Sequence, residues 1–256
     1  MRIYAIFLNT FREAVRNKIL YSLVLFAFLL LGISAFFGSV TIGQQEQVIK
    51  DFGLVLCTFF GVLMTIVIGV TLLHKELKQK TVYNILSKPV PRWEFIVGKY
   101  FGLTVTVSLL VILMGMALMV FASCFEHRVD YRMGYGILFC LFEIAVVASI
   151  VIFFSSMAVT TTLTGLFTLG AFLAGHSISY LLAFASDASA APMVRTMVHG
   201  VSWILPNLSL FNVNQVILYG GEISGSELGQ AMLYSVSYST VMLVLASLVF
   251  AKRELV

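Results

Sequence analysis

Long apolar runs separated by short polar segments dominate the chain. A helix rises about 1.5 Å per residue, so about 20 apolar residues are needed to cross the hydrocarbon core of a bilayer. Six runs reach that length, at residues 19–40, 53–73, 100–122, 134–155, 163–186 and 230–250. The pattern predicts an all-α polytopic membrane protein with six transmembrane helices.

The composition agrees with this pattern. Hydrophobic residues make up 60% of the 256 residues and charged residues 11%, against roughly half and a quarter in ordinary soluble domains. A soluble domain of this length cannot bury so much apolar surface, which excludes a water-soluble enzyme, a disordered chain and a fibrous protein. The expected surroundings are a lipid bilayer, and the net charge of +4 does not indicate a nucleic-acid partner.

The distribution of Lys and Arg sets the expected orientation. With the N-terminus in the cytoplasm, the cytoplasmic segments hold 12 of the 16 basic residues. These are Arg2, Arg12, Arg16, Lys18, Lys75, Lys78, Lys80, Lys88, Arg92, Lys99, Lys252 and Arg253, whereas Lys50, Arg128, Arg132 and Arg195 lie outside. The positive-inside rule predicts a multi-pass protein of the inner (plasma) membrane with both termini cytoplasmic.

Residues 1–18 have the pattern of an amphipathic helix. Apolar positions recur at helical spacing on one face, and polar side chains such as Arg2, Asn9, Glu13 and Arg16 lie opposite. Such a helix suits the headgroup plane of a membrane, with its cations near anionic lipid. A plain cytoplasmic extension of the first span is the alternative.

Residues 74–99, between the second and third spans, form the most informative loop. Pro89 and Pro91 each remove an N–H and disfavour a helix at the preceding residue, so residues 88–90 are expected to be extended. A new helix can begin with Pro91 at its first position and Glu94 near its positive end. The loop is therefore predicted to be a helix–break–helix elbow with six cations, either a docking surface for a cytoplasmic protein or only an anchor that fixes topology.

Residues 187–229, between the fifth and sixth spans, are apolar but interrupted. Arg195 and His199 lie among them, Pro206 breaks them, and the uninterrupted piece from Gly200 to Leu205 is too short to cross a bilayer. We expect a re-entrant segment on the outer face, which requires that protein covers its non-helical backbone.

Each catalytic motif that we considered is absent or incomplete, so we expect neither catalytic residues nor a metal site. The only Gly-Lys pair, Gly98-Lys99, lacks the upstream glycine of a nucleotide-binding loop, and no H-E-x-x-H occurs. Residues 175–178 match the G-x-S-x of rhomboid-type proteases, but the sixth span carries no histidine to act as a base.

Glu143 is the one carboxylate well inside a predicted span. An ionisable group at that depth costs about 3 kcal/mol on insertion scales, so it should face protein or a water-filled cavity. Two roles are open: contact with substrate, or a bond to hydroxyl groups on a neighbouring helix.

Nearly the whole chain resembles a permease subunit of an ABC-2 type exporter. The resemblance lies in TFREAVRNKIL (10–20), the elbow TVYNILSKPVPRWEFIVGKYFG (81–102), the order of six spans, and an outer segment that ends ILPNLSLFNV (204–213). The elbow is the specific part, because many membrane families share the hydropathy alone.

The resemblance implies a single permease domain, 1–256, that pairs with a second permease copy (a homodimer or a paralogue) and with two cytoplasmic ATPase subunits. ATP and Mg would bind to those ATPases, and this chain would bind no cofactor. Residues 187–229 would control the exit, with Pro206 and Asn207 as gate candidates. The residues expected to couple the elbow to the ATPase are Tyr83, Leu86, Lys88, Pro89, Pro91, Arg92 and Glu94.

Two other classes remain open. An ATPase-independent secondary transporter would be expected to show several intramembrane charges or paired broken helices. A non-transporting membrane anchor would instead let an ATPase complex act on an envelope assembly.

Overall fold

The computed structural model describes residues 2–40, 45–78, 91–126, 130–157, 160–186, 192–221 and 223–252. All regular elements in these ranges are helices. They are α1 (Arg2–Val15), α2 (Lys18–Val40), α3 (Gln45–Lys78), α5 (Arg92–Glu126), α6 (Arg132–Met157), α7 (Thr161–Ser186), α8 (Pro192–Ile204), the 3-10 turn η1 (Leu208–Phe211), α9 (Asn214–Leu218) and α10 (Gly225–Lys252).

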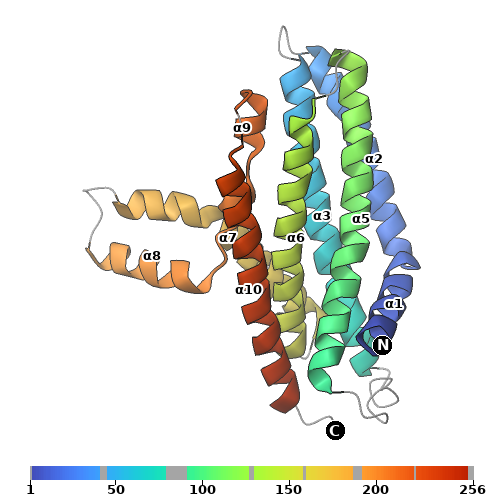
Figure 1. Cartoon of the computed structure of the whole chain (residues 1–256), viewed down its shortest axis with the longest axis vertical. Helices are drawn as coiled ribbons and strands as arrows, with labels where there is room; N and C mark the ends of the chain where they lie inside the picture. Colours follow the sequence, from blue (N-terminus) through green and yellow to red (C-terminus); the bar gives the residue numbers. More distant parts are fainter. Residues whose placement is uncertain are drawn as a thin grey trace.

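Five helices, α2, α3, α5, α6 and α10, run side by side as a bundle (Figure 1). Helix α6 lies at its centre and packs against α3, α5 and α10. Side chains from three of these helices, Met64, Val111 and Ile144, meet there with no exposed surface. The start of α1 and the end of α10 lie at the same end of the bundle (Figure 1).

Five helices are long and apolar enough to cross a membrane: Gln47–Leu72, Arg92–Ser123, Arg132–Met157, Thr161–Ser186 and Gly225–Lys252. They coincide with the second to sixth spans expected from the sequence, which confirms an all-helical polytopic membrane protein. Helix α2 covers the expected first span, but its apolar stretch within the described side chains, Lys18–Leu30, is shorter. The sixth crossing therefore stays a prediction.

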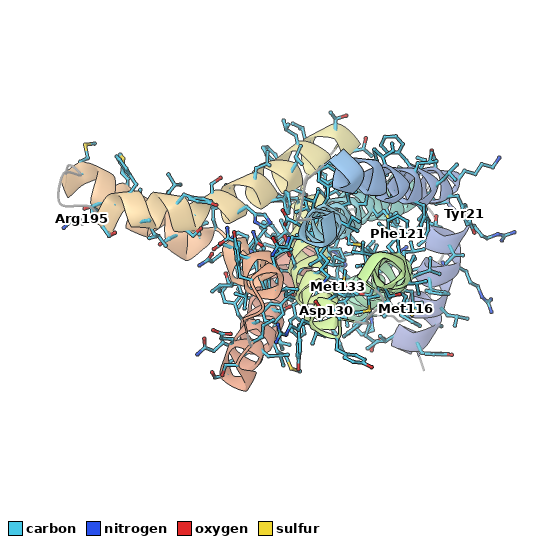
Figure 2. All side chains as sticks on the ribbon, turned by 90° about the horizontal axis from the view of Figure 1, so that it is seen from above. Tyr21, Met116, Phe121, Asp130, Met133 and Arg195 are labelled. Atoms are coloured by element: carbon cyan, nitrogen blue, oxygen red, sulfur yellow. The ribbon has the colours of Figure 1, made fainter. Side chains whose placement is uncertain are left out.

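Helices α7 and α8 form a hairpin that projects sideways from the bundle (Figures 1 and 2), and Arg195 lies near its tip. The fifth expected span, 163–186, is thus one helix, as predicted, but its far end leaves the bundle and projects sideways with α8 (Figure 1). Along its length α7 packs on different neighbours, namely α3 and α6, η1, and α8. Its other face exposes large apolar side chains such as Leu166, Leu173 and Phe184, so that face requires lipid or another chain.

Helix α1 packs along the first turns of α5. A Cβ at Gly98 would lie 2.8 Å from the Cβ of Ile6, and one at Gly102 would lie 2.5 Å from the Cβ of Thr10. The two glycines, one turn apart, therefore let the helices approach closely. Part of the apolar face of α1 that the sequence pattern assigns to the membrane interface contacts protein instead.

Lys99 lies beside this α1–α5 contact and is 2% exposed. Its Nζ atom is 4.0 Å from Glu13 Oε2 and 5.8 Å from the centre of the Phe95 ring. One of the basic residues counted toward the cytoplasmic side is therefore inside the protein, where the carboxylate and the aromatic ring compensate for lost water.

Lys50 and Asp130 join α3 to the start of α6 at the opposite end of the bundle. Lys50 Nζ donates to Asp130 Oδ2 at 2.8 Å, and the Arg132 backbone N–H donates to Asp130 Oδ1 at 3.1 Å. Partial burial by itself would raise the pKa of Asp130, but these hydrogen bonds and the nearby cations outweigh it and hold the pKa below its ordinary value.

This ion pair predicts a pH-dependent contribution to stability. A lowered folded-state pKa stabilises the folded protein above the unfolded-state pKa, and the benefit disappears as the pH falls through the folded-state pKa. We expect Asp130→Asn to lower the free energy of unfolding at pH 7 by about 1 kcal/mol or less, because the carboxylate is partly solvated, and to lower the melting temperature slightly. The difference should shrink as the pH falls below the ordinary value of 3.8 and disappear only below the folded-state pKa of Asp130, which is lower; a difference that persists unchanged in acid would contradict the role of the charge.

Candidate functional site

Glu143 and His176 form a polar pair inside the helical protein. Glu143, on α6, is 2% exposed, and its Oε1 atom lies 2.7 Å from Nε2 of His176 on α7. The α6–α7 hairpin explains why they meet. Glu143 lies 14 residues before the end of α6 and His176 lies 15 residues after the start of α7, so antiparallel helices carry them to about the same height.

A cavity of about 200 Å³ adjoins this pair. Its lining combines the carboxylate, the imidazole, two carboxamides, one hydroxyl and three phenyl rings. The residues are Val55, Thr58, Phe59, Gly136, Glu143, Phe172, His176, Phe211, Asn212 and Asn214. The Phe172 ring meets the His176 ring edge to face, with 4.8 Å between centres. The cavity thus lies where α3, α6 and α7 meet the segment from η1 to α9.

The structure shows what surrounds Glu143, for which the sequence left two roles open. Its partner is an imidazole and not the hydroxyl group considered there, and it also lines a cavity, so both protein and open space face it. Within the described parts of the chain, no third Asp, Glu, His or Cys joins them to make a candidate metal site. Hydrogen bonding and charge compensation are the chemistry that these groups provide.

The expected coupling residues are only partly described. Tyr83, Leu86, Lys88 and Pro89 lie outside the described residues. Helix α3 continues to Lys78, and α5 begins at Arg92, directly after Pro91. This start agrees with the predicted one to within a residue, which is the usual uncertainty of helix ends.

Arg92 connects the start of α5 to the end of α10. Its Nη1 atom donates to the carbonyl oxygens of Phe250 at 3.0 Å and Ala251 at 2.8 Å. The last carbonyls of a helix lack partners within the helix, and a cation there also favours the helix dipole. One turn along α5, the ring of Phe95 stacks on Phe250 with 5.8 Å between centres.

Glu94 lies in the first turn of α5, where its charge suits the positive end of the helix dipole. Its Oε2 atom is buried and makes no hydrogen bond to any described residue. Arg92 and Glu94 are thus two charged side chains in the first turn of α5 that face the protein.

The outer gate candidates lie in the non-helical segment between α8 and η1. Pro206 is buried, and its carbonyl oxygen would be 2.7 Å from a Cβ at Gly175 of α7. The backbone N–H of Asn207 donates to the hydroxyl of Tyr234 on α10 at 2.7 Å. Helices α7 and α10 therefore cover this irregular backbone, which meets the condition for such a segment at membrane depth.

Sequence analysis missed three polar residues of this region: His176, Tyr234 and Ser235. His176 could have been found by counting equal distances from the α6–α7 connection. Ser235 donates to the Phe142 carbonyl oxygen at 3.0 Å and so joins α10 to α6. The hydroxyls of Tyr234 and Ser235 bind backbone atoms far along the chain, so no local sequence pattern points to them.

Comparisons with known proteins bear on the whole chain. The sequence model of a family described as ABC-2 family transporter protein matches residues 4–255. No curated protein matches the sequence. The match includes all of the helices described above except the first two residues of α1, and so includes the α1–α5 contact at Gly98 and Gly102, the start of α5 and the polar pair. The chain is therefore a multi-pass membrane protein that belongs to the ABC-2 transporter family.

Proposed function

We propose that the chain is the permease subunit of an ABC exporter in the inner membrane. It works with a second permease copy and two cytoplasmic ATPase subunits, which bind ATP and Mg. The match of the ABC-2 family over residues 4–255 is the observation that supports this function most strongly. In this proposal α2 provides the sixth crossing, and both termini are cytoplasmic.

The proposed mechanism runs through the elbow at residues 74–99. ATP binding closes the ATPase dimer and moves the elbow, and α5 follows because it begins directly after Pro91. Arg92 binds the last carbonyls of α10, and Gly98 and Gly102 hold α1 against α5. A displacement of the elbow would therefore reach three helices at once.

The second permease copy is proposed from a surface as well as from the family. The α7 face with Leu166 and Leu173 is apolar and exposed, and a Cβ at Gly170 would meet nothing within 4 Å. Small residues on an apolar helix allow another helix to pack closely. This surface supports a contact with a partner inside the membrane.

Replacing Pro89 and Pro91 together by alanine tests the coupling role. We expect normal membrane insertion but a severalfold loss of ATPase stimulation in the reconstituted complex, because the elbow loses its fixed break. Pro192→Ala, at the start of α8, is the matched control and should stimulate normally. Unchanged stimulation in the double variant would remove the coupling assignment.

A secondary transporter is the second candidate, because Glu143 and His176 are two ionisable groups inside the membrane region. Co-purification separates the two functions. An ABC permease should retain an ATPase subunit and need ATP for transport, whereas a secondary transporter should move solute in proteoliposomes without either.

A further inference from the structure

The cavity beside Glu143 has the chemistry of a cation site. Its described lining contains one carboxylate, the carboxamides of Asn212 and Asn214, and the hydroxyl of Thr58, all of which offer oxygen atoms. Three phenyl rings, Phe59, Phe172 and Phe211, add π faces, which attract cations. Neither Lys nor Arg occurs among the lining residues. An anion would therefore find no lysine or arginine in this lining to balance its charge.

The Glu143–His176 hydrogen bond explains how such a site can stay empty of cations without an isolated charge. When the cavity is empty, the buried carboxylate is hydrogen-bonded to the imidazole and is therefore not isolated. A cation bound in the cavity would bring a positive charge close to that carboxylate. Glu143 and His176 are the titratable groups among the lining residues from α3, α6, α7, η1 and the start of α9.

The size of the cavity restricts the ligand. A volume of about 200 Å³ corresponds to roughly six or seven water molecules at about 30 Å³ each. This volume suits a small organic cation, either free or as the headgroup of a lipid, and is too small to hold a polymer or a whole lipid. Three phenyl rings and only one carboxylate in the lining favour an alkylated ammonium over a divalent metal ion, which protein sites usually hold with more than one charged oxygen ligand.

We propose that this cavity binds a small alkylated ammonium group, with Glu143 as its counter-ion and Phe59, Phe172 and Phe211 around its alkyl groups. The binding site belongs to this chain alone. A failure of the proposal would therefore leave the ATPase coupling untouched, and a failure of that coupling would leave the binding site intact.

Thermal unfolding of the purified permease in detergent tests the proposal, with choline as the probe. A ligand that binds only the folded protein raises the melting temperature with its concentration. We expect choline chloride to raise it by several degrees, while sodium chloride at equal ionic strength does not. The neutral isostere 3,3-dimethylbutan-1-ol should give little or no shift, and equal stabilisation by the alcohol would show apolar filling and overturn the proposal. Phosphocholine distinguishes a free cation from a lipid headgroup, because only a headgroup site should accept the attached phosphate.

Two variants locate the binding site. Glu143→Gln should weaken choline binding at least tenfold, whereas Asp51→Asn, which changes an exposed carboxylate on α3, should not. If Glu143→Gln fails to fold, Phe59→Leu tests the binding site instead. Phe59 is 52% exposed, so its replacement should not disturb the packing of the core. We expect Phe59→Leu to weaken binding severalfold and Phe101→Leu, at a residue 49% exposed on α5, to leave it unchanged. Absence of a choline shift in the unaltered protein, or equal binding by Phe59→Leu and Phe101→Leu, would overturn the proposal.

Discussion

Gly102→Val is expected to lower the melting temperature of the permease by several degrees. A Cβ at this position would lie 2.5 Å from the Cβ of Thr10 and 3.2 Å from the Phe7 carbonyl oxygen. Thr10 is fully buried and cannot swing away, so α1 must move off α5. Overpacking of this kind costs about 1–3 kcal/mol, more than the helix propensity gained on replacing glycine. Melting in detergent, followed by circular dichroism, measures the effect.

The matched control is Gly229→Val in α10, where a Cβ would meet nothing within 4 Å. This change should leave the melting temperature unchanged or raise it slightly. Equal melting temperatures for the two variants would contradict the close α1–α5 contact. Helix propensity alone would change the melting temperature of both variants in the same direction.

Arg92→Met is expected to lower ATPase-driven transport about tenfold while the permease still folds and inserts. Methionine keeps most of the aliphatic stem but cannot donate to the carbonyl oxygens of Phe250 and Ala251. The end of α10 then loses its cap, and in the proposed mechanism a movement of α5 is no longer passed to α10. ATPase stimulation and transport in proteoliposomes measure the loss.

Two controls separate this capping role from loss of charge and from direct docking. Arg12→Met removes an exposed cation of α1 and should leave ATPase stimulation and transport nearly unchanged. Arg92→Lys keeps a single donor group but lacks the planar fork of arginine, so its transport should lie between that of the unaltered protein and that of Arg92→Met. The ATPase should still co-purify with Arg92→Met; if it is lost, Arg92 binds the ATPase directly and the connection to α10 is secondary.

Hydrophobic patterning predicted the helices well because each apolar run must form a helix to satisfy its backbone in lipid. The second to sixth spans appear where the pattern placed them, and α5 begins after Pro91, where the two prolines require a break. The direction of α7 was not predictable in the same way. Length and hydropathy give a helix, whereas its orientation depends on η1, α8 and whatever covers its exposed face.

The contacts of the candidate site were predicted less well than the helices. The burial of Glu143 followed from the cost of a charge in the membrane, but its partner His176 was missed. The close packing of α1 on α5 at Gly98 and Gly102 was not predicted either. Arg92 binds main-chain oxygens, which every residue type carries, so no sequence pattern could have named Phe250 and Ala251.

The meeting of Glu143 and His176 makes the α6–α7 hairpin sensitive to its own length. One residue inserted in α7 before His176 would rotate the imidazole by about 100° and shift it by about 1.5 Å along the axis. Many surface loops tolerate insertions. Here the spacing within α7 maintains the hydrogen bond between His176 and Glu143, so the first 15 residues of this helix should tolerate an extra amino acid poorly.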